Sequence, residues 1–158
     1  MQIINNEKLI VRTRHPSRIT QAIQNSKPIG KKDDVTSIEV AWGLEEAISL
    51  RKLNIKNVPS PILKDYDWPG LYAPMSHQKE TASFLSVNRR AFCFNEQGTG
   101  KTASSIWASD YLIDQGLVNR VLIICPLSIM QSAWQADLFK FAVHRTINIA
   151  YGTRNKRI

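Results

Sequence analysis

The stretch at 95–102, NEQGTGKT, has residue types and spacing that suit one defined chemistry. Gly98 and Gly100 permit backbone conformations that other residues avoid, so the N–H groups of this loop can turn toward a bound anion. Lys101 stands where a lysine reaches the β- and γ-phosphates of a nucleotide, and the hydroxyl of Thr102 stands where Mg²⁺ is held. We therefore predict a site for ATP and Mg²⁺, with catalytic roles for these last two residues. The predicted nucleotide-binding residues of the loop are Gly98, Thr99, Gly100, Lys101 and Thr102.

The segments on either side of this loop have the patterns that a phosphate loop requires. An apolar run, AFCF at 91–94, precedes it, and a helical pattern over about 101–115 follows it and ends at Gly116. The start of such a helix adds partial positive charge where the phosphate binds. The complete pattern has a glycine where this chain has Asn95, so the match is to the shorter string G-x-G-K-T.

From residue 76 onward, apolar runs alternate with helical patterns. The predicted helices lie at about 76–87, 101–115 and 129–142, and the predicted strands lie at 91–94, 120–125 and 146–150. Continuous apolar strands separated by helices are typical of a parallel sheet with crossover helices, which is an α/β fold.

Residues 1–58 have the pattern of a separate, small α+β unit. Strands are expected at 9–13 and 37–42, with a polar loop at 26–34 between them and a helix after residue 42. Residues 59–74 form a connector, because they contain four of the seven prolines. This connector also holds Tyr66, Trp68 and Tyr72. These aromatic rings can stack on a nucleic-acid base or pin the connector to the next domain.

Three stretches resemble the Swi/Snf family of DNA-dependent ATPases, within helicase superfamily two. They are PMSHQKETASFL at 74–85, the loop at 95–102, and VLIICPLSIMQSAWQADLFKF at 121–141, with a looser match in YGTRNKR at 151–157. The family loop usually reads Asp-Glu-Met-Gly-Leu-Gly-Lys-Thr, so this loop suggests a divergent branch, and phage-encoded members of the family are the nearest resemblance. The resemblance implies that residues 75–158 are the first part of a RecA-like helicase ATP-binding lobe.

The resemblance also implies roles for residues outside the loop. Gln78 would read the adenine edge, which suits a side-chain amide, and the alternative is that it is a polar residue of a helix N-terminus. Pro126, Leu127 and Ser128 would contact a DNA phosphate. Ser128 and Gln131 also match a capping box, so Ser128 has a structural role beside the functional one.

A complete motor of this family needs an acidic segment for Mg²⁺ and a second lobe, and neither follows residue 125. We therefore expect the N-terminal part of an ATP-dependent DNA helicase or translocase whose second lobe lies in the same longer chain. Alone, it should hydrolyse little or no ATP. The alternative is a non-catalytic nucleic-acid-binding or regulatory protein derived from such a motor. A small-molecule kinase fits the loop but leaves Gln78 and the Cys-Pro-Leu-Ser turn unexplained.

The composition is that of a folded, water-soluble chain, with 43% hydrophobic and 22% charged residues. The apolar runs are far shorter than the roughly 20 residues that cross a bilayer, and no signal-peptide pattern is present. We expect a cytoplasmic protein without a membrane partner, in the host cytoplasm if it is phage-encoded. The net charge of +8 favours a polyanionic partner, and the preference for DNA over RNA rests on the family resemblance.

Overall fold

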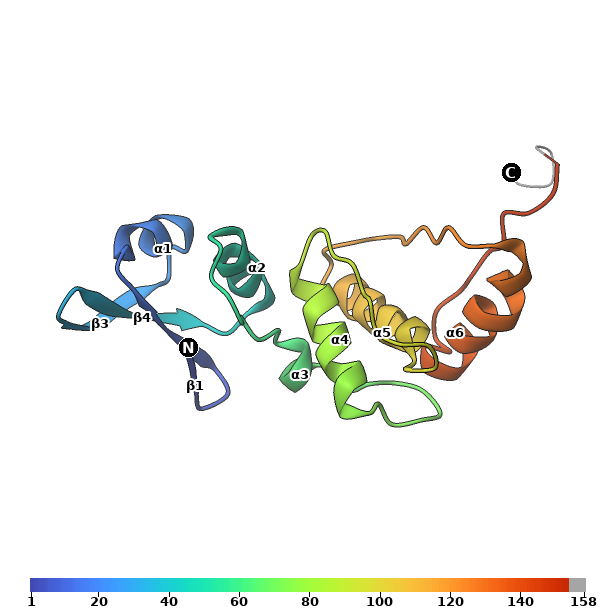
Figure 1. Cartoon of the computed structure of the whole chain (residues 1–158), viewed down its shortest axis with the longest axis horizontal. Coiled ribbons are helices and arrows are strands. Elements are labelled where there is room, and N and C mark those ends of the chain that lie inside the picture. The colour runs from blue at the N-terminus through green and yellow to red at the C-terminus, as the bar shows by residue number, and fades with distance from the viewer. Residues whose placement is uncertain (154–158) are drawn as a thin grey trace. The chain divides into compact units, whose positions relative to one another are not determined.

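In the computed structural model, residues 1–153 are described, and the chain divides into two compact units (Figure 1). One unit comprises Met1–Tyr66 together with Ser83–Ala91, and the other comprises Asp67–Ala82 together with the chain from Phe92 onward. Most of the YGTRNKR match lies beyond Thr153 and so outside the described residues.

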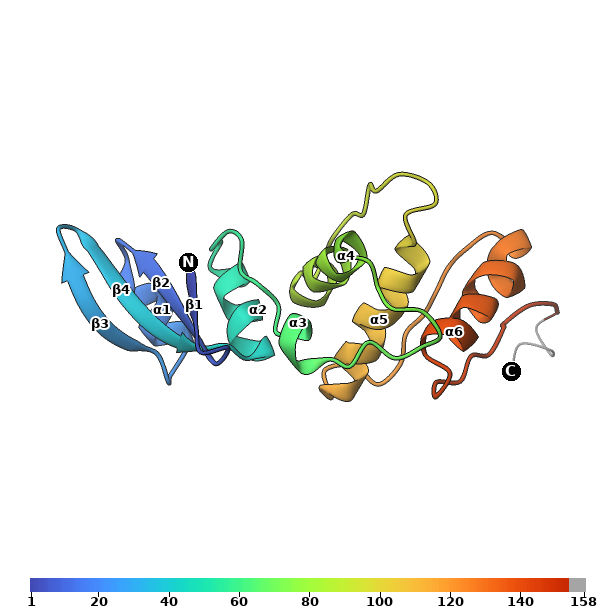
Figure 2. The ribbon, with the colours of Figure 1, turned by 90° about the horizontal axis from the view of Figure 1, so that it is seen from below.

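The first unit is built on a four-stranded sheet in the order β1-β2-β4-β3, in which every pair is antiparallel (Figure 2). Its strands are β1 (Gln2–Ile4), β2 (Lys8–Thr13), β3 (Lys27–Lys32) and β4 (Val35–Ala41). Leu9 lies opposite Val40 and Val11 lies opposite Ile38, and all four side chains are buried. Because directly paired residues point to the same side of a sheet, these residues form one apolar face.

Three helices complete this part of the chain. They are α1 (Pro16–Ala22), α2 (Leu44–Lys52) and α3 (Ile62–Asp65). α1 contacts β4, and its Ile19 is only 1% exposed. In α2, the buried residues Leu44, Ala47 and Leu50 recur at helical spacing and so lie on one face.

The predicted strands at 9–13 and 37–42 and the helix after residue 42 correspond to β2, β4 and α2. The prediction of a loop at 26–34 was wrong, because Lys27–Lys32 is the edge strand β3. All of its side chains are exposed, so its sequence lacks the alternation of apolar residues that marks a half-buried strand. Its pairing with β4 follows instead from the turn after Lys32, where Asp33 has a φ of 53°.

The remaining helical elements are α4 (Ser76–Val87), α5 (Lys101–Asp114), a 3-10 turn η1 (Leu127–Ile129), a π-helical segment η2 (Met130–Gln135) and α6 (Ala136–Phe141). The predicted helices at 76–87 and 101–115 are confirmed as α4 and α5. The single helix predicted at 129–142 is divided among η1, η2 and α6. Among the described residues, no helix is long and apolar enough to span a bilayer.

α5 ends where its sequence predicts. Gly116 has a φ of 70° and donates to the carbonyl of Ile113, while Leu117 donates to the carbonyl of Leu112. This pair of bonds is a Schellman motif, which satisfies carbonyl groups left free at the end of a helix.

The expected partial RecA-like domain, with a parallel sheet and crossover helices, is contradicted by the structure. Over residues 1–153 the only sheet is the antiparallel sheet of β1 to β4. The predicted strands at 91–94, 120–125 and 146–150 belong to no strand, and Figure 1 draws them as coil. Phe94 and Ile124, expected to be buried, are each 89% exposed. A run of apolar residues indicates a tendency to be buried, but it does not supply the neighbouring strand that a sheet requires.

Candidate nucleotide-binding site

The predicted phosphate loop leads directly into the first turn of α5. Gly98 and Gly100 have φ values of 76° and 75°, in the left-handed region that glycine occupies without strain. Gly100 is the N-cap of the helix, and no side chain caps this end. The first N–H groups of a helix have no partner within the helix, so this end offers donors and partial positive charge to an anion.

Lys101 is held by the backbone of its own loop. Its Nζ donates to the carbonyl oxygens of Asn95, at 2.9 Å, and Glu96, at 2.7 Å. The Thr99 hydroxyl also donates to the Glu96 carbonyl, at 2.8 Å. The loop therefore folds back over the lysine ammonium, which remains half-exposed. A phosphate can replace these neutral carbonyls with charged oxygen acceptors, which form stronger hydrogen bonds to an ammonium.

Gln78 lies against the loop, as a shared nucleotide site requires. Its Nε2 donates to the Thr99 carbonyl at 3.4 Å, and its Oε1 accepts from the backbone N–H of Met75 at 2.9 Å. The Nε2 atom of His77 lies 3.0 Å from the same Thr99 carbonyl. The structure thus brings together Gln78 and the loop, and it adds His77, which the sequence analysis did not single out.

Asn95 occupies the position at which the complete loop pattern has glycine. Its Nδ2 donates to the hydroxyl of Thr81 on α4, at 2.9 Å. A glycine could not make this contact, so the departure from the pattern adds an attachment between the start of the loop and α4. The sequence analysis identified neither Asn95 nor Thr81 as a site residue. The asparagine at a position where the loop pattern has glycine was the one indication that this side chain has a role.

Thr102 is the second residue of α5 and is half-buried beside Lys101. Mg²⁺ usually keeps several waters and binds nucleotide phosphates together with one or two protein oxygens, so a hydroxyl at this position fits the expected ion. Residues 1–153 contain no group of three or more His, Cys, Asp or Glu side chains that could hold a metal by themselves.

The predicted DNA-contact turn is exposed. Pro126 precedes the 3-10 turn η1, which contains Leu127 and Ser128, and all three residues are open to solvent. No side chain caps this turn, so the predicted capping box of Ser128 and Gln131 does not form. Ser128 lies inside the turn instead of at its N-cap, and its carbonyl accepts from the Ser132 hydroxyl at 2.8 Å. Among the described residues, no hydrogen bond joins this turn to the phosphate loop.

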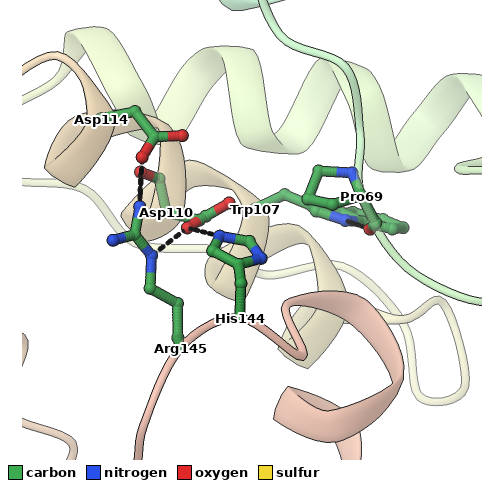
Figure 3. Close-up of polar contacts among 6 residues, drawn as sticks. All are labelled: Pro69, Trp107, Asp110, Asp114, His144 and Arg145. Atoms are coloured by element: carbon green, nitrogen blue, oxygen red, sulfur yellow. Dashed lines mark hydrogen bonds and ion pairs between the residues drawn. The ribbon is translucent and has the colours of Figure 1, made fainter.

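The connector is attached to α5 through Trp107, which lies beside Pro69 (Figure 3). The Trp68 ring meets the Trp107 ring edge-on at a centroid distance of 5.7 Å, and the Trp107 indole donates to the Pro69 carbonyl at 2.9 Å. Trp107 is fully buried, and Tyr66 is 9% exposed. These contacts support the pinning role for Trp68, while Tyr66 is buried within the first unit. Tyr72 is 62% exposed, and its ring lies 6.3 Å from that of Phe141 between centroids.

A buried carboxylate on α5 forms a second polar cluster, which had no signal in the sequence (Figure 3). The Asp110 side chain is 2% exposed, and its Oδ1 contacts Arg145 Nε at 2.5 Å and His144 Nε2 at 2.9 Å. Arg145 also pairs with Asp114, one helical turn further along α5. The hydrogen bond that Arg145 donates to Asp110 raises the pKa of Arg145 above its ordinary value, so the guanidinium stays charged at every pH at which proteins are handled. The cluster holds the segment after α6 against α5.

No protein-family model, curated protein or solved structure matches this chain. Function must therefore be inferred from the arrangement of its own residues. In that arrangement an open helix N-terminus, a glycine loop and a lysine converge, which suits a phosphorylated ligand.

Proposed function

We propose that this chain binds ATP through the loop at 95–102, as the nucleotide-binding part of a DNA-dependent ATPase of the Swi/Snf type. One observation carries the proposal: Lys101 and two left-handed glycines stand at the uncapped start of the 14-residue helix α5. Backbone N–H groups, the helix dipole and an ammonium are then directed at one place, which is the arrangement that binds a polyphosphate.

Each loop residue has a distinct task in this proposal. The backbone N–H groups of residues 98–102, that of Gly100 included, bind phosphate oxygens. Lys101 gives up its hydrogen bonds to the carbonyls of Asn95 and Glu96 and binds the β- and γ-phosphates. Thr102 helps to hold Mg²⁺, which neutralises phosphate charge when it is bound.

Gln78 retains the capacity to read adenine. A side-chain amide has two N–H donors and an oxygen with two lone pairs, and the structure uses one donor and one lone pair. The remaining donor and acceptor match the pair of groups on an adenine edge.

We propose little or no hydrolysis by this chain alone. Only three carboxylates follow the loop, and each is in an ion pair: Asp110 and Asp114 with Arg145, and Asp137 with Lys140. Each is held by a cation that lies outside the loop at 95–102, so none of the three is oriented to activate a water for attack on the γ-phosphate.

Equilibrium titration with a fluorescent ATP analogue in the presence of Mg²⁺ tests the binding proposal. We expect saturable binding at one site, competition by ATP, and competition by AMP at least about tenfold weaker, because AMP lacks the two phosphates that Lys101 meets. Absence of saturable binding would refute the proposal. Phosphate release at the rate of a working motor, stimulated by DNA, would refute the expectation of little hydrolysis.

We further propose that the turn Pro126–Ser128 contacts a DNA phosphate. Its exposure and its uncapped 3-10 start support this role, since the hydroxyl of Ser128 and the N–H groups of the turn can then donate to an anion.

A second candidate function is nucleic-acid binding without catalysis, and the β-sheet supplies the observation that favours it. Arg12 pairs with Ser37, Lys27 with Glu39, and Lys32 with Val35. These β4 residues alternate with the buried Ile38 and Val40, so the three exposed cations share the opposite side of the sheet, on which Ile10 is buried. Lys8 lies on the same side and is paired with Glu39 at 2.9 Å. We define Arg12, Lys27 and Lys32 as the basic sheet face.

The salt dependence of DNA binding tests this candidate. Replacing the three cations of the basic sheet face with glutamine should weaken binding to duplex DNA and reduce the slope of log K against log salt by about 2 to 3, roughly one per phosphate contact. Fluorescence anisotropy measures both quantities.

The control removes three exposed cations of the same first unit that lie off the sheet, namely Lys52, Lys56 and Arg90. This variant has the same net charge as the test variant and should retain the slope of the unmodified chain. Equal losses in the two variants would show that only net charge matters, and would exclude a defined binding face.

A further inference from the structure

The peptide group between Thr99 and Gly100 is held from one side by two side chains of α4. The Nε2 atoms of His77 and Gln78 lie 3.0 Å and 3.4 Å from the Thr99 carbonyl oxygen. The contact from His77 is within the normal range of an N–H···O hydrogen bond, whereas the contact from Gln78 is longer than about 3.2 Å and therefore weaker. His77 therefore donates the stronger hydrogen bond to this carbonyl.

The direction of this carbonyl fixes the direction of the next N–H. In a trans peptide the C=O and N–H bonds point in opposite directions, so the Gly100 N–H points away from α4 when the Thr99 carbonyl points toward it. Glycine adopts positive and negative φ with similar ease, and Gly100 has a φ of 75°. The backbone alone therefore sets little preference for this orientation, and the side-chain donors on α4 determine it.

The orientation of this peptide group affects anion binding, because the Gly100 N–H lies next to the uncapped N-terminus of α5. In the observed orientation this N–H is available to a phosphate on the side away from α4. If the peptide turned over, the Thr99 carbonyl would instead present a partial negative charge to the anion.

The turn of α4 that carries His77 is itself anchored to the loop. The Thr81 hydroxyl donates to the His77 carbonyl at 2.7 Å and accepts from Asn95 Nδ2 at 2.9 Å. The beginning of the loop, at Asn95, and its apex, at Thr99, are thus both attached to one helical turn. This attachment fixes the distance from which His77 reaches the carbonyl.

We propose that His77 is a positioning residue for polyphosphate binding, which rests on the proposed function of the loop. It donates its Nε2–H to the Thr99 carbonyl and so presets the Gly100 N–H for a phosphate oxygen. The imidazole touches the loop and not the nucleotide. Its effect therefore reaches any ligand with a phosphate at this position, whether ATP, ADP or pyrophosphate.

Three substitutions test this role with the fluorescent ATP titration. His77→Phe keeps a ring but removes the donor, and should weaken binding about three- to tenfold, the effect of one net hydrogen bond. His77→Ala should weaken it similarly, and it carries the test if the Phe variant does not fold. His77→Gln places an amide N–H near the former Nε2 position and should restore affinity to within about twofold of the unmodified chain.

A spectroscopic readout separates positioning from general damage. In the nucleotide-free chain, the ¹⁵N and ¹H shifts of the Gly100 amide should change in His77→Phe and return toward their original values in His77→Gln. His15→Phe, at an exposed histidine of the other unit, should change neither the affinity nor this resonance.

The outcomes distinguish this role from the loop assignment. If Lys101→Ala loses ATP while His77→Phe and His77→Ala bind it as tightly as the unmodified chain, the positioning role is overturned and the loop assignment stands. If both variants bind weakly and His77→Gln does not recover, the donor is not the cause, and the role is likewise overturned. If the unmodified chain binds no ATP, both the loop assignment and the positioning role of His77 are refuted.

Discussion

Replacing Lys101 with alanine is expected to weaken ATP binding at least about thirtyfold, because hydrogen bonds to charged groups contribute about 1.5–3 kcal/mol each. The ammonium already lies within the loop, bonded to the carbonyls of Asn95 and Glu96, so it needs little rearrangement to meet a phosphate. The dissociation constant from the fluorescent ATP titration measures the effect. Removing a single positive charge at the centre of the loop should exceed every other single substitution in its effect on affinity.

Lys140→Ala is the matched control for this prediction. Lys140 is an exposed lysine in a surface ion pair with Asp137, and such pairs contribute at most about 1 kcal/mol to stability. The control should bind ATP as the unmodified chain does. Equal affinity in Lys101→Ala and the unmodified chain would remove the phosphate-loop assignment.

The second large effect concerns stability. Asp110→Ala should lower the free energy of unfolding by about 2–4 kcal/mol, because it leaves Arg145 and His144 without the buried carboxylate that they share. Urea denaturation followed by circular dichroism measures this loss. The pKa of Arg145 is raised in the folded chain, so its contribution to stability is fully present throughout the neutral and moderately alkaline range. It is lost only when the pH rises through this raised pKa.

Asp137→Ala provides the comparison, since its partner Lys140 is 46% exposed and the pair contributes less than about 1 kcal/mol. A double-mutant cycle between Asp110 and Arg145 then measures their coupling, which should exceed about 1 kcal/mol. A similar small loss from Asp110→Ala and Asp137→Ala, with no coupling, would contradict the stabilising role of the cluster.

Local signals in the sequence predicted the helices of the site well. α5 begins after Gly100 and ends before Gly116, and both glycines have the positive φ that marks the ends of this helix. Helix ends depend on residues a few positions apart, so the sequence pattern contains most of the information that fixes them. The apolar strands β2 and β4 of the first unit could be predicted for the same reason.

Strand pairing was much less predictable, since it depends on residues far apart in the chain. The runs at 91–94 and 120–125 are apolar enough for central strands, yet they lie in no strand of the described structure. Conversely, Lys27–Lys32 has only exposed side chains and is a strand because β4 supplies its hydrogen bonds. Hydrophobicity describes the tendency of a segment to be buried, whereas a sheet requires a specific partner.

In the site, too, residues close in sequence were predictable, whereas contacts between residues far apart in sequence were not. The loop residues were identified from their own spacing, and Gln78 from a family resemblance. His77 meets Thr99 across 22 positions, and Arg145 meets Asp110 across 35. No periodicity connects residues at such separations, so only the folded arrangement of α4, α5 and the loop reveals these contacts.

Backbone amide mapping by NMR during a titration with Mg²⁺ and ATP tests the nucleotide site most directly. If the loop binds the triphosphate, the amides of residues 98–102 should shift most, and Lys101→Ala should abolish the shifts at the same ATP concentrations. Shifts confined to the basic sheet face around Arg12, Lys27 and Lys32, with none in the loop, would contradict the nucleotide site and favour a general polyanion-binding protein.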